Sequence, residues 1–148
     1  MRAYYSEMIT IAKSEARSTA APAAFFRKWE DMASWPEWNS DVEWVRLDGP
    51  FATGSRGVLK PKGGPRVKFV IESLVPDREF VDVSLLAGAR LTFRHVVEPL
   101  SEGGSHVQVT VTMTGPLRWL WLRILGSGLK TSLQPDLDRL VAAAETAK

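Results

Sequence analysis

One histidine of this chain stands in an apolar setting that suits proton transfer. The residues from 91 to 97 alternate in the manner of a β-strand, and His95 shares one side of that strand with Phe93 and Val97. A histidine that lines a pocket can donate, accept or transfer a proton near neutral pH. The alternative, which general experience favours, is a neutral core histidine held by a hydrogen bond, because no neighbour in the sequence forms a dyad with it.

Asp82 is a second candidate for proton transfer, provided that its strand turns it inward. In the segment 79–86, Asp82 shares one side with Phe80, while Val81 and Val83 occupy the other. A buried carboxylate has a raised pKa and becomes a serious catalytic candidate. The side of Val81 and Val83 is the more apolar one, which favours the interpretation that Asp82 points outward.

Standard catalytic and cofactor signatures are missing from the sequence. The chain has no cysteine, which excludes a disulfide, a thiolate nucleophile and a sulfur-ligated metal. The two histidines, His95 and His106, are too few for a typical histidine-rich metal site, and alternation places His106 on the opposite, outer side. Neither a phosphate-binding glycine loop nor a nucleophile elbow occurs. We therefore expect no metal and no cofactor.

A sheet is needed to position these side chains, and the sequence predicts one. Seven short segments are rich in β-branched and aromatic residues and are separated by turn residues, which indicates an antiparallel meander. A helix over 23–32 and a second short helical turn or loop over 33–39 follow the first strand. The predicted strands are 9–16, 42–47, 56–60, 67–75, 79–86, 91–97 and 107–113.

A long apolar helix is predicted to begin near Pro116 and to run almost to the end of the chain. Its apolar positions recur at helical spacing, among them Trp121, Leu125 and Leu129. Pro135 interrupts the pattern, and we expect one bent helix rather than two. A single helix beside a sheet must cover one of its faces, and a curved sheet leaves an apolar pocket beneath the helix.

Four of the six tryptophans lie close together in the sequence, at Trp29, Trp35, Trp38 and Trp44. Each can bury a large area, so we expect most of them to pack the short helices against the sheet. The functional alternative is a stacking wall for an aromatic ligand, formed by one or two of them. Asn39 beside them can point its amide into the pocket mouth or cap a helix end.

Length and charge narrow the class of protein further. The chain of 148 residues is most simply one domain spanning residues 1–148, with a net charge of +2 and no basic stripe of the kind that binds nucleic acid. Residues 117–125 form the longest apolar run, far short of the roughly 20 residues of a membrane span. Met1–Glu7 lacks the apolar segment of a signal peptide. We expect a cytoplasmic protein.

The run 117–125 is apolar on nearly every side, which three interpretations can explain. The first is burial beneath the glycine-rich loops. The second is a homodimer surface, because Trp119 and Leu122 fall off the core-facing stripe. The third is contact with a membrane surface, anchored by Arg118 and Arg123.

Several segments carry a resemblance to a known family. They are Trp35-Pro36-Glu37-Trp38-Asn39, 49–57, 75–80, 93–99 and 114–117. From about Ile9 to Glu145 the chain resembles the SRPBCC (START-like, helix-grip) superfamily, in its polyketide cyclase/dehydrase-type branch. The resemblance implies an α+β helix-grip fold, in which a curved antiparallel sheet of about seven strands wraps around a long C-terminal helix and two short helices follow strand 1.

The resemblance also implies a function, with two alternatives. The principal expectation is binding of a hydrophobic or aromatic small molecule between the sheet and the C-terminal helix. The alternatives are a polyketide cyclase/dehydrase-type enzyme with His95 as acid/base, and a dimeric or membrane-surface protein acting through Trp119 and Leu122. The residues expected to bind the ligand are Trp35, Trp38, Asn39, Phe69, Ile71, Phe93, His95, Val109, Val111, Trp121, Leu125 and Leu129.

Overall fold

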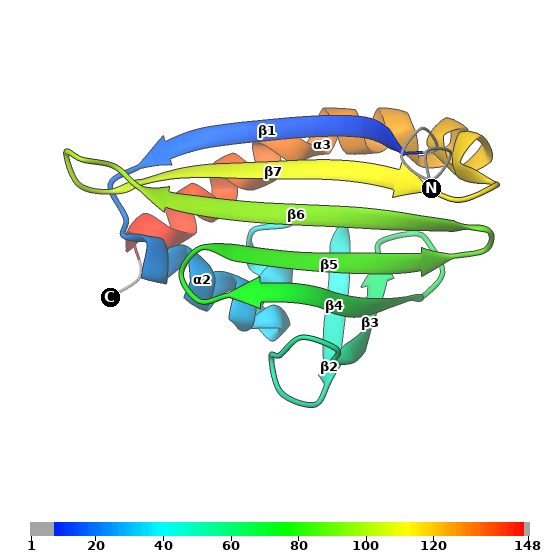
Figure 1. Cartoon of the computed structure of the whole chain (residues 1–148), viewed down its shortest axis with the longest axis horizontal. Helices are drawn as coiled ribbons and strands as arrows, with labels where there is room; N and C mark the ends of the chain where they lie inside the picture. Colours follow the sequence, from blue (N-terminus) through cyan, green and yellow to red (C-terminus); the bar gives the residue numbers. More distant parts are fainter. Residues whose placement is uncertain (1–7, 147–148) are drawn as a thin grey trace.

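A curved antiparallel sheet of seven strands wraps around the long C-terminal helix α3, which confirms the predicted helix-grip fold (Figure 1). The computed structural model describes residues 8–146, so the segment Met1–Glu7, where we predicted no signal peptide, lies outside it. The strands pair in the order β1-β7-β6-β5-β4-β3-β2. Their bounds are β1 Ile9–Ser18, β2 Val42–Asp48, β3 Arg56–Pro61, β4 Val67–Val75, β5 Glu79–Leu86, β6 Ala89–Pro99 and β7 Ser105–Thr114.

The helices all lie on one face of the sheet. Helix α2 spans Pro22–Glu30, begins with a proline in its first turn and contacts α3, β5 and β6. The 3-10 helix η1, Met32–Glu37, follows it directly. Helix α3 is a single element, Arg118–Thr146, that continues through Pro135 as predicted. None of the helices among residues 8–146 is long and apolar enough to cross a bilayer.

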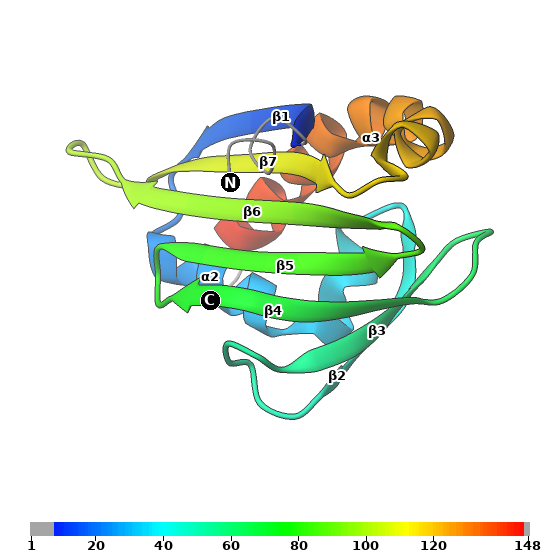
Figure 2. The same ribbon diagram turned by 45° about the vertical axis from the view of Figure 1, so that its right-hand side comes forward.

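The sheet bends at its far end, where β2 and β3 run obliquely to the remaining strands (Figure 2). A bulge in β4 contributes to the irregularity, because Ile71 pairs with Asp82 and Ser73 pairs with Val81, which leaves one residue unpaired between them. After the bulge, from Ser73 onward, residues of β4 that simple alternation places inside point outward, and the reverse. Leu74 packs into the core, whereas Val75, which simple alternation places inside, is exposed.

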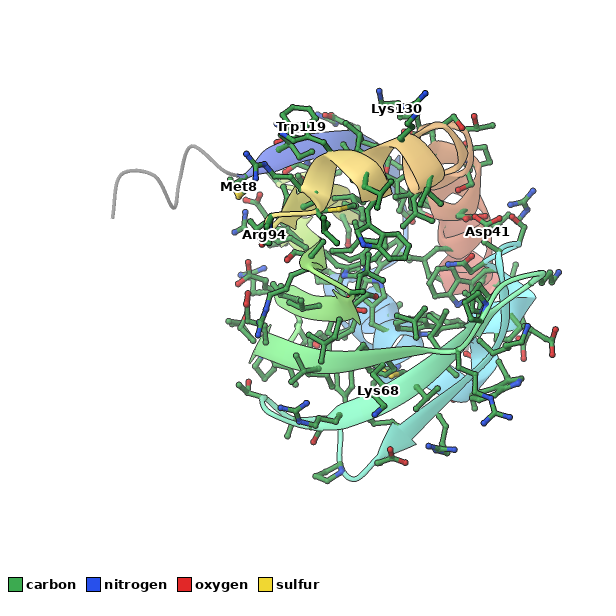
Figure 3. The ribbon with its side chains drawn as sticks, turned by 90° about the vertical axis from the view of Figure 1, so that its right-hand side faces the viewer. Met8, Asp41, Lys68, Arg94, Trp119 and Lys130 are labelled. Carbon is green, nitrogen blue, oxygen red and sulfur yellow. The ribbon has the colours of Figure 1, made fainter. Side chains whose placement is uncertain are left out.

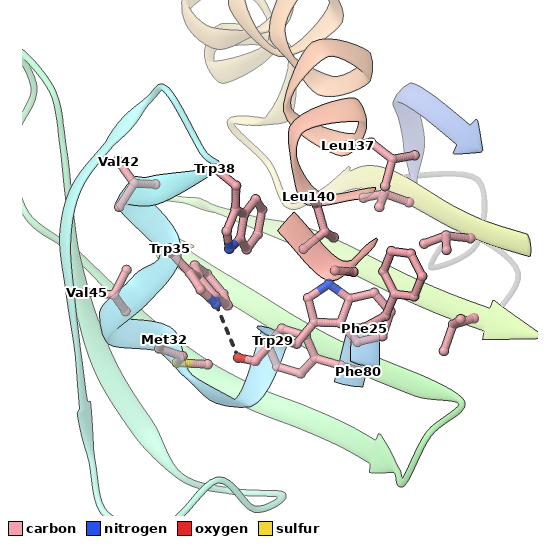
Figure 4. Packing of buried hydrophobic residues seen from close by; sticks show 14 of the residues in the cluster. Phe25, Trp29, Met32, Trp35, Trp38, Val42, Val45, Phe80, Leu137 and Leu140 are labelled. Carbon is pink, nitrogen blue, oxygen red and sulfur yellow. Dashed lines mark hydrogen bonds between the residues drawn. The ribbon is translucent and has the colours of Figure 1, made fainter. Parts of the chain in front are cut away.

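Tryptophan packing closes the sheet on the side of α2 and η1, as predicted for most of these side chains (Figure 4). Trp29 is fully buried, and its ring lies 6.3 Å from that of Phe80 between centroids. The Nε1–H of Trp35 donates a hydrogen bond of 3.2 Å to the carbonyl oxygen of Trp29. At Gly57 any Cβ would overlap the ring of Phe69, so glycine is needed for that ring to lie against β3.

One edge of the sheet, strand β1, is held by α3 through the side chain of Gln134. The backbone N–H of Glu15 donates to Gln134 Oε1 at 3.3 Å, and Gln134 Nε2 donates to the carbonyl oxygen of Glu15 at 3.1 Å. The side-chain amide thus satisfies both peptide groups of one edge residue. This pair of bonds fixes the distance between α3 and the sheet at the midpoint of the helix.

Candidate functional site

A cavity of about 360 Å³ lies between α3 and the concave face of the sheet. Figure 3 views the molecule from the end at which α3 lies above the strands and Asp41 lies beside the helix. The residues that line the cavity are mostly apolar or aromatic, and a small number of polar residues lie among them. The polar residues that line it are Asn39, Asp41, Asp82, Ser84, His95, Ser132 and Asp136.

His95 and Asp82 meet in the wall of this cavity. The β5–β6 register pairs Phe80 with His95, which puts Asp82 at a diagonal position on the same face. The Nδ1 of His95 lies 2.9 Å from the carbonyl oxygen of Phe80 and 3.9 Å from Oδ1 of Asp82. Since a carbonyl only accepts, Nδ1 carries the proton and donates it to Phe80, and the Asp82 distance is too long for a hydrogen bond.

The inward position of Asp82 corrects the interpretation favoured from the sequence. Both sides of β5 are buried, with Val81 and Asp82 each 5% exposed. The apolar side of Val81 and Val83 therefore does not mark the cavity face, because residues on both sides of this central strand are buried. Asp82 and Ser84 line the cavity instead.

Burial drives both ionisable groups toward their neutral forms. Desolvation raises the pKa of Asp82 from 3.8 to about 7, and a backbone hydrogen bond opposes the shift. Desolvation lowers the pKa of His95 from 6.5 to about 4, against the effect of its hydrogen bond to Phe80. Asp82, and not His95, is therefore the group that exchanges a proton near neutral pH.

Polar atoms without partners are concentrated around the cavity. Among residues 8–146, Oδ1 of Asp82 and the Nε1–H groups of Trp29 and Trp38 are buried and lack a hydrogen bond. All three side chains belong to residues that line the cavity. A buried polar group without a partner costs roughly 1–3 kcal/mol, which a bound molecule with matching groups can offset.

Asp136 joins α3 to the loop that precedes β2. Its Oδ1 accepts hydrogen bonds from the backbone N–H and the hydroxyl of Ser40, at 3.2 and 3.0 Å, and from Arg139 at 2.8 Å. Burial raises the pKa of Asp136, while the bonds from Ser40 and the charge of Arg139 act in the opposite direction. Sequence reasoning missed this residue, and its position one residue after Pro135 in an apolar stripe was the only available signal.

The structure brings most of the predicted ligand-binding residues to the cavity wall. These residues come from η1 and its following loop, from β6 and β7, and from the middle of α3, which are far apart in the sequence. The residues that line it are Trp35, Trp38, Asn39, Phe93, His95, Val109, Leu125 and Leu129.

Four predicted residues lie outside the lining, and each has a packing reason. Phe69 and Ile71 are buried in the cluster around Trp29, and Val111 is buried in a second cluster beneath the first half of α3. Trp121 packs on that second cluster, and its Nε1–H donates to the carbonyl oxygen of Ala87 at 2.8 Å. Side-chain periodicity predicted correctly that these residues are on the inner face of the sheet or helix. It could not show that they pack within the core clusters and do not reach the cavity.

The first half of α3 presents apolar side chains to the outside. Trp119 and Leu120 are 59% and 50% exposed, and Figure 3 shows Trp119 on the outer side of the helix. Ile124 is also 57% exposed, but it lines the cavity. Burial beneath the glycine-rich loops is therefore wrong for these residues. Leu122 instead is half-buried against the second cluster, so it contributes less to this surface than expected.

Comparison with solved structures supports the fold. The chain is similar to one domain of the di-domain ARO/CYC StfQ from the steffimycin biosynthetic pathway (TM-score 0.74, 15% identity, covering 97% of this chain and 53% of that one). It is also similar to truncated norcoclaurine synthase from Thalictrum flavum (TM-score 0.73, 11% identity, 95% and 96% covered). A third is MLL2253 from Mesorhizobium loti (TM-score 0.71, 15% identity, 95% and 98% covered). At these identities the likeness shows the fold alone.

No curated protein matches the sequence. A family model does match, over residues 9–145, and its description is polyketide cyclase / dehydrase and lipid transport. The matched range contains every strand and helix described above except the last residue of α3, Thr146. The chain therefore belongs to the polyketide cyclase / dehydrase and lipid transport family.

Proposed function

We propose that this protein binds a hydrophobic or aromatic small molecule in the cavity beneath α3. The observation that carries the proposal is a mostly apolar space of about 360 Å³ whose lining residues include Asp82, Trp29 and Trp38, each of which has a buried polar atom without a partner. A pocket with an apolar wall and a few convergent polar groups is the usual form of a small-molecule site. The family description, which includes lipid transport, supports the same assignment.

Affinity in such a site comes mainly from apolar area removed from water. The contribution is about 25 cal/mol per Å², before the cost of ordering the ligand is subtracted. The cavity is near the lower end of the roughly 300–1,000 Å³ range of small-molecule pockets. It therefore suits a compact aromatic molecule or a short chain better than a large lipid.

The direct test is native mass spectrometry of the purified protein, followed by denaturing extraction. A co-purified apolar molecule, released only on unfolding, would identify the ligand class. Titration with N-phenyl-1-naphthylamine, a neutral fluorescent probe of apolar cavities, covers the case in which the expression host supplies no ligand. Absence of both a co-purified molecule and probe binding contradicts the proposal.

Filling the cavity should abolish binding without unfolding the protein. Ser84→Leu adds apolar volume to a lining position, so we expect N-phenyl-1-naphthylamine affinity to fall at least about tenfold, a loss of about 1.4 kcal/mol. Fluorescence titration measures the affinity, and circular dichroism checks the fold. Ser127→Leu, the same change at an exposed position of α3, is the matched control and should bind as the parent does. Equal binding by both variants would place the probe elsewhere.

The second candidate is a cyclase/dehydrase-type enzyme with His95 as the acid/base. The approach of His95 Nδ1 to Asp82 Oδ1, 3.9 Å apart in the wall of a mostly apolar cavity, favours it. In this reaction class Asp82 would supply a proton and His95 would accept one at Nε2, which makes no hydrogen bond within the described chain. His95→Gln separates the two functions, because an enzyme loses turnover and keeps affinity, whereas a carrier has no turnover to lose.

The third candidate is a dimeric or membrane-surface protein that acts through Trp119 and Leu122. The exposure of Trp119 and of Leu120 beside it favours this use of the helix more than the half-buried Leu122 does. Sedimentation velocity of the parent and of Trp119→Gln distinguishes a dimer, and co-sedimentation with phosphatidylglycerol vesicles distinguishes membrane contact. A variant that changes neither result excludes both uses.

A further inference from the structure

The side chains that can carry a charge near neutral pH in the cavity wall are all acidic. Its lining includes three aspartates, Asp41, Asp82 and Asp136, and within the described residues it includes no lysine and no arginine. His95 adds no positive charge, because burial lowers its pKa to about 4. The acidic character is local, since the whole chain carries a net charge of +2.

The three carboxyl groups are not equivalent. Asp136 already accepts hydrogen bonds from Ser40 and Arg139, and Asp41 is exposed beside the helix (Figure 3). Asp82 is 5% exposed, and its Oδ1 is buried without any hydrogen-bond partner among residues 8–146. Most buried polar atoms in native proteins have a hydrogen-bond partner, either in the protein or in another molecule such as water, an ion or a ligand. Asp82 is therefore the group that a ligand would meet.

Aromatic rings surround the same space. Trp29, Trp35 and Trp38 all line the cavity, and the rings of Trp35 and Trp38 lie 5.8 Å apart between centroids. Tryptophan faces attract ammonium groups, and the attraction grows where water is excluded. A carboxylate combined with indole faces is a suitable environment for a cation attached to an apolar body.

We propose that the cavity selects apolar or aromatic molecules that carry a protonated amine, with Asp82 as the counter-ion of that amine. The proposal rests on the proposed binding function and names the ligand class for the same site. It also predicts what the cavity rejects. A carboxylate such as a fatty acid anion would be buried beside Asp82 with no lining cation to compensate it, which is strongly unfavourable.

Binding of an amine at this position is linked to protonation of Asp82. The free carboxyl has a pKa of about 7, and an ammonium beside it favours the ionised form. The other titratable groups near Asp82 are His95 from β6, Asp136 from α3 and Asp41 from the loop before β2, and β4 and α2 present only apolar or aromatic side chains there. Amine affinity is expected to fall about tenfold from pH 8 to pH 6 and about a hundredfold to pH 5.

Three ligands that differ only in their head group test the proposal. They are 2-(1-naphthyl)ethylamine, 2-(1-naphthyl)ethanol and 1-naphthylacetic acid, titrated calorimetrically at pH 8. We expect the amine to bind at least about tenfold more tightly than the alcohol, and the acid to show no measurable binding. Asp82→Asn should bring the amine to within about threefold of the alcohol and remove the pH dependence. Asp77→Asn is the matched control, an equal change of charge in the exposed turn after β4, at a positive φ that asparagine tolerates.

Each other outcome overturns a specific part of the proposal. If the alcohol or the acid binds as tightly as the amine, the ligand class is wrong and the proposed binding function stands. If none of the three binds while N-phenyl-1-naphthylamine does, the ligand class is wrong and the proposed binding function stands. If N-phenyl-1-naphthylamine also fails to bind and nothing co-purifies, both are wrong. An amine preference that persists in Asp82→Asn shows that Asp82 is not the counter-ion. Should that variant fail to fold, the parent protein decides the point, because unchanged amine affinity from pH 8 to pH 6 also excludes Asp82.

Discussion

Asp82→Asn is expected to increase the stability of the ligand-free protein at pH 8, by up to about 4 kcal/mol. At this pH the carboxyl is ionised in both the folded and unfolded states, so the folded state carries the full cost of burying the charge. That cost corresponds to the rise in the pKa of Asp82 from 3.8 to about 7. Asparagine has nearly the same shape and carries no charge. Most substitutions of buried residues destabilise, so a gain here is a distinctive result.

The pH dependence of stability gives a sharper form of the same prediction. Between pH 3.8 and 7 the folded state retains the Asp82 proton that the unfolded state has lost, so stability falls by about 1.4 kcal/mol for each pH unit. Between pH 4 and 6.5 the unfolded state binds a proton on His95 that the folded state does not, so stability rises at the same rate. The two slopes cancel from about pH 4 to 6.5 in the parent protein.

Substituting either Asp82 or His95 should therefore leave the pH dependence of stability that the other residue produces. Asp82→Asn should gain about 3 kcal/mol of stability from pH 4 to 6.5, and His95→Gln should lose a similar amount. Urea denaturation at half-unit pH intervals measures both profiles, and Asp77→Asn should run parallel to the parent. Parallel profiles for the parent and Asp82→Asn would contradict the burial of an ionisable pair in this cavity.

Trp29→Ala should be among the most destabilising substitutions in the chain, at about 3–5 kcal/mol. The side chain is fully buried and its ring lies 5.3 Å from His95 and 6.3 Å from Phe80 between centroids. Its removal takes away transfer free energy and leaves a void that joins the ligand cavity. Guanidinium denaturation gives the loss directly.

The matched control for this substitution is Trp119→Ala, at a residue that is 59% exposed. Its ring lies beneath the guanidinium of Arg118, whose central carbon is 5.6 Å from the ring centroid, and such an exposed contact contributes about 0.5–1 kcal/mol. The control should therefore lose no more than about 1 kcal/mol. A loss below about 1.5 kcal/mol for Trp29→Ala would mean that the core closes around the missing ring, and that the short helices are less tightly held than the packing indicates.

The element order was predictable from the sequence because each strand is bounded by a turn that the residues specify. Gly49, Gly63 and Gly88 all adopt positive φ between strands, a conformation that glycine readily provides. Side-chain alternation gave the wrong inward face where a strand contains a bulge or is buried on both faces. The β4 bulge reverses the side of Val75, and the burial of β5 on both faces conceals the side of Asp82.

The site was less predictable than the fold, since it depends on which core layer each apolar residue occupies. Phe69 and Phe93 have equivalent patterns in the sequence, yet Phe69 rests against Gly57 and Phe93 lines the cavity. The same limit applies to α3. Its apolar positions are too numerous to show which side meets the sheet, and Leu120, which helical spacing assigns to the core stripe, is exposed.

The paired bonds between Gln134 and Glu15 have a consequence for self-association. An outermost strand displays free peptide groups that can template the addition of a strand from another molecule. The primary amide of Gln134 occupies the position of such an incoming peptide group, with one donor and one acceptor already engaged. Growth of the sheet past β1 therefore requires two existing bonds to break first, which protects the protein against edge-to-edge aggregation while the cavity beneath stays open to small molecules.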